Sequence, residues 1–271
     1  MNNHDIPSNE QGVSESIGFM LIFSIVIAGI AIVTLYGYPL LLQQQVGADE
    51  KIMEKNMIVL QNDIKSLAYK TVPFKETSLK IGGGSLTVYN SSYSPSTFSI
   101  DITDSAGTTH YLSTPFQSGD LRYESISAQT DISLQNGAVV MRPSIQPGSV
   151  MLAEPRWFYD GPTNTMVINL INITSTDLMA KEGIGTVRMR LVGEPYYNET
   201  NFVVGDSRLP IYLKYTTDSA QNYSVAWDSY FTEKLDMTPT ASGIYRLPIN
   251  SASQYPGRLV IKRFEVEIQN I

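Results

Sequence analysis

The chain has 271 residues, a formal net charge of −7, no cysteine and only two histidines, His4 and His110. The lack of cysteine excludes disulfides and thiolate chemistry, and two histidines give little material for a metal site or a Ser/His/Asp triad. The acidic balance, without any dense Lys/Arg cluster, argues against nucleic acid as a partner. We therefore expect no enzyme activity, no metal and no cofactor.

A polar leader is followed by an uncharged run from Ile17 to Leu42. The run is apolar on every face of a helix, whereas a buried helix of a soluble protein usually keeps a polar stripe. As an α-helix it exceeds the about 30 Å of a bilayer's hydrocarbon core. We predict a membrane-spanning helix over residues 13–42, with the lipid bilayer as its partner.

The junction between leader and span carries a motif. Gln11-Gly12-Val13-Ser14-Glu15-Ser16-Ile17-Gly18 runs directly into the apolar helix. From Gln11 to about Gln45 the sequence resembles the N-terminus of archaeal type IV pilin-like and archaellin-like proteins. The resemblance implies that a prepilin peptidase removes a leader of residues 1–12, and that the helix is both membrane anchor and filament core, packing with copies of itself or with other pilin-like subunits.

The acidic residue at the helix entrance has two interpretations. A cut before Gln11 makes Glu15 the fifth mature residue, where related pilins use a glutamate to neutralise the terminal amine of an adjacent subunit; a cut before Val13 makes it the third. A carboxylate in an apolar bundle is costly unless it is paired with a cation. Alternatively, Glu15 is an ordinary acid near a helix start, where the helix dipole favours it.

Two signals disagree on membrane orientation. Lys51 and Lys55 follow the span, while the leader has no Lys or Arg, so the positive-inside rule alone would place the C-terminal domain inside. The C-terminal region, however, is rich in Ser, Thr and Tyr. It also carries four N-x-[ST] sequons, at Asn90, Asn172, Asn198 and Asn222. We therefore expect a single-pass cell membrane protein with its C-terminal domain outside, or a surface filament, and glycosylation at these four asparagines.

An amphipathic helical stalk is predicted over residues 43–72. Gly37 and Pro39 should bend the helix just before it. A narrow apolar seam then repeats at intervals of four, three, four and three residues, formed by Met53, Met57, Leu60, Ile64 and Leu67. The seam can pack on the chain's own β domain, which we favour, or on a neighbouring copy. Thr71-Val72-Pro73-Phe74 should end the helix.

The remainder, residues 73–271, breaks into short alternating runs separated by turn residues. We predict a hairpin or a bulged strand at Leu79–Tyr89, which contains Gly82-Gly83-Gly84. Further strands are predicted at Thr97–Thr103, Thr108–Leu112, Leu121–Ser127, Asp131–Leu134, Ala138–Arg142, Val150–Ala153, Met166–Ile173, Thr186–Val192, Ile211–Tyr215 and Arg258–Gln269. A helix over about Ser219–Leu235 carries an aromatic face that should cover a sheet. The fold class is thus a long N-terminal transmembrane helix followed by a mainly antiparallel, sandwich-like extracellular β domain with one packed amphipathic helix, α+β overall.

Other motifs give little chemistry. Asp101, Asp104 and Asp120 do not form a calcium loop. Gly183-Ile184-Gly185 lacks the third glycine of a dinucleotide fingerprint and is expected to be a turn. Exposed residues around Pro195-Tyr196-Tyr197-Asn198 would suit ligand recognition or an ordinary turn.

The leading hypothesis is a structural cell-surface subunit of the type IV pilin-like class, anchored and assembled through its hydrophobic helix. The alternatives are an uncleaved, signal-anchored surface binding module or adhesin, and a minor pseudopilin of an assembly machine.

Overall fold

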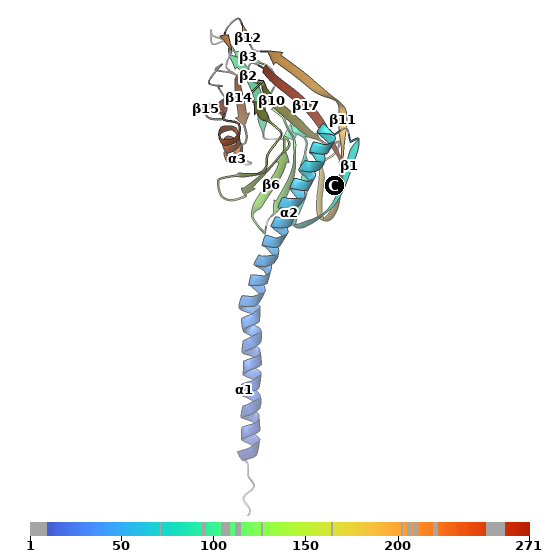
Figure 1. Ribbon diagram of the computed structural model, residues 1–271. Coiled ribbons are helices and arrows are strands. Elements are labelled where there is room, and N and C mark those ends of the chain that lie inside the picture. The colour runs from blue at the N-terminus through green and yellow to red at the C-terminus, as the bar shows by residue number, and fades with distance from the viewer. Residues whose placement is uncertain are drawn as a thin grey trace, which may run out of the picture. The chain divides into compact units, whose positions relative to one another are not determined.

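The computed structural model describes residues 10–70, 72–93, 96–103, 109–111, 115–125, 127–163, 165–201, 203–204, 207–208, 211–218, 222–247 and 258–271 (Figure 1). Its internal contacts divide the chain into two compact units, Met1–Ala48 and Asp49–Ile271. Each unit is described separately below.

The first unit is a helix with an apolar surface. It comprises α1 (Glu10–Ile32), a π-helical segment η1 (Val33–Gly37) and the beginning of α2 (Tyr38–Tyr69). Where we expected a bend at Gly37 and Pro39, the chain forms η1, and the Tyr38 N–H donates to the Val33 carbonyl. The π-turn fits the sequence because Pro39 has no N–H for the carbonyl four residues earlier. Within the described residues, the helix from Ser16 onward is the one that is long and apolar enough to cross a membrane.

The second unit begins inside α2, at Asp49, and buries the predicted seam. All five seam residues are at most 1 % exposed and share a core with strand residues, which confirms packing on the chain's own β domain: Met53, Met57, Leu60, Ile64 and Leu67. Ile52 and Val59, on the flank of the seam, stay 39 % and 46 % exposed. The helix ends at Tyr69, before Pro73, as the sequence predicts.

The larger sheet has nine strands in the order β8-β7-β6-β5-β1-β11-β17-β10-β9. In chain order these are β1 (Phe74–Tyr89), β5 (Asp120–Ser125), β6 (Thr130–Gln135), β7 (Ala138–Pro143), β8 (Val150–Ala153), β9 (Phe158–Asp160), β10 (Thr165–Thr174), β11 (Met179–Asn201) and β17 (Arg258–Asn270). Among the described strands, β10 and β17 form the one parallel pair. The fully antiparallel arrangement typical of a sandwich is therefore not present, although the domain remains mostly antiparallel.

A second sheet has the order β15-β16-β14-β2-β3, with β4 also paired to β2. Its strands are β2 (Thr97–Thr103), β3 (Thr109–Tyr111), β4 (Phe116–Gln117), β14 (Ile211–Thr216), β15 (Thr238–Ala241) and β16 (Ile244–Arg246). A two-residue pair joins β12 (Val203–Val204) and β13 (Ser207–Arg208), and a 3-10 turn, η2, spans Ser91–Tyr93.

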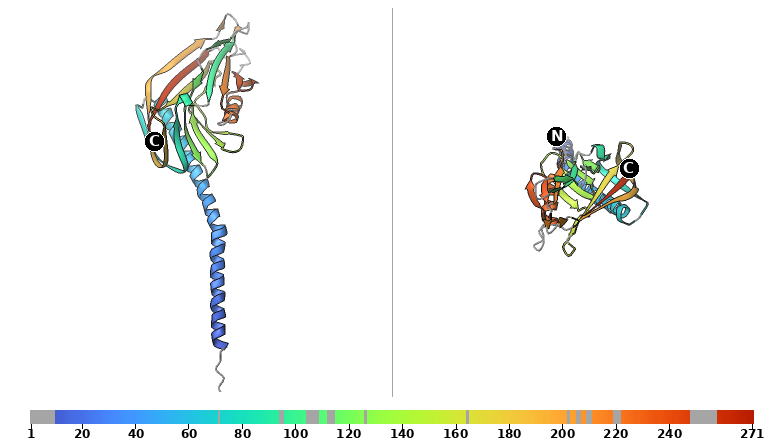
Figure 2. Two further views of the ribbon diagram at one scale, coloured as in Figure 1. Left: turned by 180° about the vertical axis from the view of Figure 1, so that it is seen from behind. Right: turned by 90° about the horizontal axis from the view of Figure 1, so that it is seen from above.

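The nine-stranded sheet separates two hydrophobic cores because neighbouring residues of a strand point to opposite faces. On β17, Leu259 and Ile261 belong to one core, whereas Phe264, Val266 and Ile268 belong to the other. The second core is closed by the part of α2 after Asp49, and the first by the smaller sheet and α3 (Ser224–Ser229). Figures 1 and 2 show these layers on the two faces of the large sheet.

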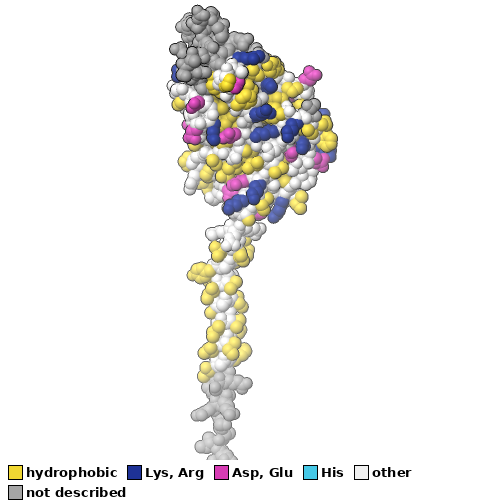
Figure 3. All heavy atoms as spheres, viewed as in Figure 1, with side chains coloured by type: hydrophobic (Ala, Val, Ile, Leu, Met, Phe, Trp, Pro, Cys, Tyr) yellow, Lys and Arg dark blue, Asp and Glu magenta, His cyan; other side chains and the backbone are white. Residues whose placement is uncertain are grey.

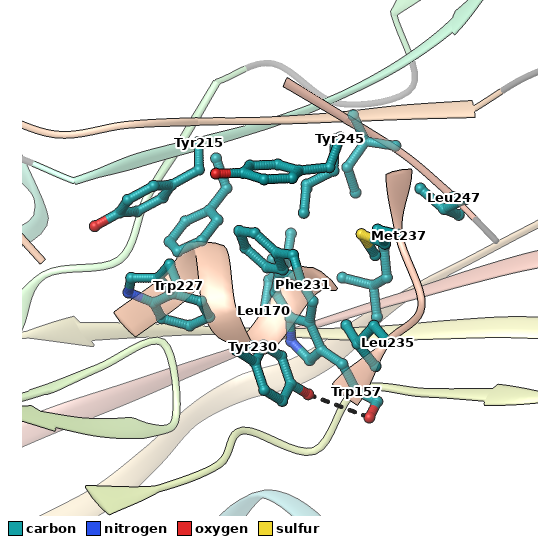
Figure 4. Packing of buried hydrophobic residues seen from close by; sticks show 14 of the residues in the cluster. Trp157, Leu170, Tyr215, Trp227, Tyr230, Phe231, Leu235, Met237, Tyr245 and Leu247 are labelled. Carbon is teal, nitrogen blue, oxygen red and sulfur yellow. Dashed lines mark hydrogen bonds between the residues drawn. The ribbon is translucent and has the colours of Figure 1, made fainter. Parts of the chain in front are cut away.

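Aromatic side chains fill the core beneath α3 (Figure 4). The Trp227 ring lies 6.0 Å from the Trp157 ring and 5.5 Å from the Phe231 ring, measured between centroids. The Tyr230 hydroxyl donates to the Trp157 carbonyl at 3.3 Å. The predicted aromatic face is thus core packing, as expected for rings that gain most by burial.

The helix itself is shorter than predicted. The α-helical part is Ser224–Ser229, and it continues as a π-helical segment, η4 (Tyr230–Lys234). The predicted start at Ser219 lies outside the described residues. Asn222 precedes the helix, and its Oδ1 accepts a hydrogen bond from the Ser224 N–H at 2.8 Å.

All the predicted strands are present, but the strand predicted at Thr186–Val192 is much longer than expected. We expected Thr186–Val192 with a turn at Gly183–Gly185 before it, whereas β11 runs without interruption from Met179 to Asn201. Its partners β1 and β17 supply backbone hydrogen bonds along nearly its whole length, which overrides the local turn tendency of glycine. The short strands β4, β9, β12, β13, β15 and β16 were not predicted, because runs of two to four residues carry too little periodicity.

Candidate functional site

The predicted processing residues lie in α1. Gln11, Gly12, Val13 and Glu15 are helical, but their side chains lie outside the described residues. Cleavage by a prepilin peptidase and charge pairing by Glu15 therefore stay predictions.

The surface of the first unit suits a hydrocarbon environment. Phe19, Met20, Leu35 and Tyr36 are each about 70 % exposed, and Figure 3 shows hydrophobic side chains along this helix. The serine and the threonine inside the run bond to their own helix: Ser24 donates to the Met20 carbonyl at 2.7 Å, and Thr34 to the Ile30 carbonyl at 2.8 Å. No polar group of these two side chains then needs water, which is the condition that lipid imposes.

The four sequons differ in access. Asn222 is exposed. Asn90 donates its amide to the Ser175 carbonyl at 3.0 Å, and the Asn172 Oδ1 is buried without a hydrogen-bond partner among the described residues. The side chain of Asn198 lies outside the described residues. Asn222 is the most exposed of the three described side chains, so we expect it to be the sequon that a glycan reaches most easily.

The buried acid Asp120 is not available to a metal. Its Oδ2 accepts hydrogen bonds from the Arg122 Nε and Nη2 atoms at 3.0 and 2.6 Å, and from the Ser133 hydroxyl at 2.9 Å. Asp104 lies outside the described residues, and the side chains that the structure describes contain no group of three metal-ligating residues. Asp120 therefore acts as the counter-ion of Arg122.

A groove of about 630 Å³ lies on the large sheet. On β17, Phe264 lies under the end of α2, where the Tyr69 ring meets it edge-on with centroids 5.2 Å apart. The same face of the strand continues past the end of the helix, and there Arg258, Val260 and Lys262 line the groove. We call this surface the end-of-helix groove.

Strand register places the groove side chains next to one another. Tyr197 of β11 pairs with Lys262 of β17, which pairs with Asn169 of β10. On the far edge, Phe158 of β9 pairs with Val167 of β10. The groove floor is thus built on four adjacent strands, which hold side chains more rigidly than loops do.

A bulge in β11 forms one wall of the groove. The register between β11 and β17 shifts between Val192 and Tyr196, so that Gly193, Glu194 and Pro195 stand opposite a single residue. Gly193 has a positive φ of 65°, which glycine adopts without strain. Bulges of this kind re-aim the side chains that follow them. Here these are Tyr196 and Tyr197, both 54 % exposed.

The groove is electrostatically positive. Arg156, Arg258 and Lys262 line it, and none of the described lining residues is acidic. The Arg156 guanidinium lies over the Tyr69 ring, 4.7 Å from its centroid. Burial raises the pKa of the Tyr69 hydroxyl to about 12, although Arg156 opposes the shift. The pKa of Lys65 is lowered by burial; Glu154 opposes this effect and Arg156 adds to it.

Sequence reasoning found part of this groove. Pro195, Tyr196 and Tyr197 were considered for ligand recognition, although they lie in β11 and not in a turn. Arg156, Phe158 and Lys262 were missed. A signal was present in the sequence of β17. On the face of the strand that carries Arg258 and Lys262, the alternate residues from Phe264 onward are all apolar: Phe264, Val266 and Ile268. That change marks the point where the covering helix ends.

Comparison with known proteins gives one family. Residues 11–267 match the profile of DUF7289, described as a family of unknown function. No curated protein and no solved structure matches the chain.

Proposed function

We propose that this chain, which belongs to the family of unknown function DUF7289, is a structural cell-surface subunit of the type IV pilin-like class. In this proposal the helix of the first unit anchors the chain in the bilayer, and in a filament the same helix packs against copies of itself or other pilin-like subunits. The β-rich unit from Asp49 onward faces the outside. The role is structural and not enzymatic.

One observation carries the proposal: the helix from Ile17 to Leu42 exposes apolar side chains on every face. An exposed apolar surface of this extent is unstable in water and needs lipid or other helices to cover it. Ser24 and Thr34 bond within the helix, so that they add no demand for water. Among the described residues, the buried cores are formed by residues after Asp49 alone.

The direct test is intact mass and N-terminal sequencing of the chain recovered from its native membrane. An N-terminus at Gln11, Gly12 or Val13 would establish prepilin-type processing. An N-terminus at Met1 or Asn2 would contradict it and favour the uncleaved, signal-anchored form. Presence in sheared filament fractions separates the filament subunit from a monomeric anchored protein or a minor pseudopilin.

Orientation has its own test. Protease added to intact cells should digest the domain after Asp49 while leaving the apolar helix protected. Full protection of that domain would place it inside, as the flanking charges alone suggest, and would refute the surface location.

The second candidate is a signal-anchored binding module. It is favoured by the end-of-helix groove, which is open, positively charged and lined by exposed rings. The two functions are compatible, because the groove and the anchoring surface belong to different units.

A further inference from the structure

The end-of-helix groove has a cationic lining although the chain as a whole is acidic. The chain carries a net charge of −7, yet the described lining of the groove is cationic, with Arg156, Arg258 and Lys262. Figure 3 shows Lys and Arg side chains gathered with hydrophobic ones over β10, β17 and the end of α2. A local positive field in an acidic molecule selects for anionic groups of a ligand.

Within the described residues, aromatic rings, and not carboxylates, lie next to two of the three cations of the groove, Arg156 and Lys262. Among the described residues, neither Arg156 nor Lys262 forms an ion pair with a carboxylate, and both instead lie over aromatic rings. The Lys262 Nζ lies 5.7 Å from the centroid of the Tyr197 ring. A cation–π contact holds the side chain in place but leaves its N–H donors available to a carboxylate or sulfate oxygen.

The rings of the groove provide apolar contact area. Phe158 is 43 % exposed, and Tyr196 and Tyr197 are each 54 % exposed, although such rings gain most from burial. They stand on strands and so need little ordering on binding. A ligand that fits has apolar faces to pack on the rings and negative charges that can meet separate cations.

Sugar rings that carry acidic groups have both properties. We propose that the end-of-helix groove binds a segment of an acidic polysaccharide, with its carboxylate or sulfate groups on Arg156 and Lys262 and its sugar faces on Tyr197 and Phe158. Nucleic acid is the competing polyanion, but its dense charge would meet the repulsion of a chain with net charge −7 beyond this short groove. The inference goes beyond the anchoring role and holds whether or not the leader is cut.

The test is calorimetric titration of the full chain in nonionic detergent. The probes are tetragalacturonic acid, its methyl ester with the same sugar rings but no charge, and a sulfated tetrasaccharide. We expect one of the acidic probes to bind, the ester to bind at least about tenfold more weakly, and affinity to fall as salt is raised. Absence of binding by both acidic probes at millimolar concentration, or equal binding of acid and ester, would overturn the proposal.

Variants locate the site. Lys262→Met, Arg156→Met and Tyr197→Ala should each weaken binding on the order of tenfold, while Lys262→Arg retains it. The matched controls are Lys234→Met and Tyr93→Ala, which remove exposed side chains of the same kinds elsewhere. A thermal melt equal to the parent's shows that each variant is folded. Groove variants that bind like the controls would place the ligand elsewhere, and tighter binding of a single-stranded oligonucleotide of equal charge would replace the polysaccharide by nucleic acid.

Discussion

At the scale of single residues, the most demanding element is the buried pair of Asp120 and Arg122. Both side chains are almost fully buried, at 3 % and 1 % exposure. The Arg122 guanidinium also lies 4.3 Å above the Tyr89 ring, and its Nη1 is 3.6 Å from Glu124 at the surface. A buried charge pair adds little net stability, but removing one partner leaves the other charge buried without compensation.

Asp120→Ala should therefore destabilise the fold by about 3–5 kcal/mol. Glu124→Ala removes the other carboxylate near Arg122, but its side chain is 38 % exposed, so we expect a loss of less than about 1 kcal/mol. Urea unfolding of the detergent-solubilised chain, followed by tryptophan fluorescence, compares the two. Similar losses for both variants would show that Arg122 reaches water and that the pair is not buried.

Residue access also governs modification. In protein from the native membrane we expect a glycan on the peptide containing Asn222 and none on those containing Asn90 and Asn172, whose amides are engaged or buried. Glycopeptide mass spectrometry reads all three sites, and Asn222→Gln should abolish the glycan signal from its peptide. A glycan at Asn172 would mean that modification precedes folding.

At the scale of elements, α2 joins the β domain through one narrow face. Besides the apolar seam, Gln61 donates two hydrogen bonds from its Nε2, to the Gly137 carbonyl at 2.8 Å and to the Glu154 carbonyl at 2.9 Å. These bonds reach the β6–β7 turn and the segment before β9. These contacts fix the rotation of α2 about its own axis and its position on the sheet. The groove begins where the helix ends, at Ala68 and Tyr69.

Two neighbouring residues of α2 test this packing. Leu60 is fully buried, whereas Val59 is 46 % exposed. Leu60→Ala should cost about 2–5 kcal/mol through lost burial and the cavity left behind. Val59→Ala should change stability by less than about 0.5 kcal/mol. Chemical denaturation gives both values, and a small loss for Leu60→Ala would indicate that α2 dissociates from the sheet without unfolding it.

At the scale of the whole molecule, the β domain depends on a core rich in tyrosine. Burial raises the pKa of Tyr215 to about 12, although hydrogen bonds with Ser96 and Thr217 oppose the shift. Burial likewise raises the pKa of Tyr223 and Tyr230. These hydroxyls must stay protonated in the folded state, while in the unfolded chain a tyrosine ionises near pH 10.

Stability should consequently be constant up to about pH 10 and fall between pH 10 and 12. Over that interval the unfolded chain loses a proton that folded Tyr215 keeps, so unfolding becomes more favourable as the pH rises. Tyr215 alone accounts for about 3 kcal/mol. Urea midpoints measured from pH 8 to 12 test this. Tyr215→Phe should make the fall less steep, whereas Tyr93→Phe, at a ring 79 % exposed, should match the parent.

The sequence by itself determined the local elements. The unbroken apolar run predicted the first helix, the four-three spacing from Met53 to Leu67 predicted the seam, and alternation predicted eleven stretches that are strands in the fold. These patterns are strong because 3.6-residue and two-residue periods are set by backbone geometry within each element. Pro73 and Phe74 likewise marked the change from helix to strand.

Only the tertiary structure decided the features that depend on contacts between distant parts of the chain. It paired β10 with β17 in parallel, extended β11 through glycines that locally favour a turn, and set the end of α2 on a sheet that continues beyond it. The groove draws Arg156, Lys262 and Tyr197 from three distant parts of the chain, so no local pattern joins them. Their meeting depends on strand order and register, which are fixed by how the whole sheet buries its two faces.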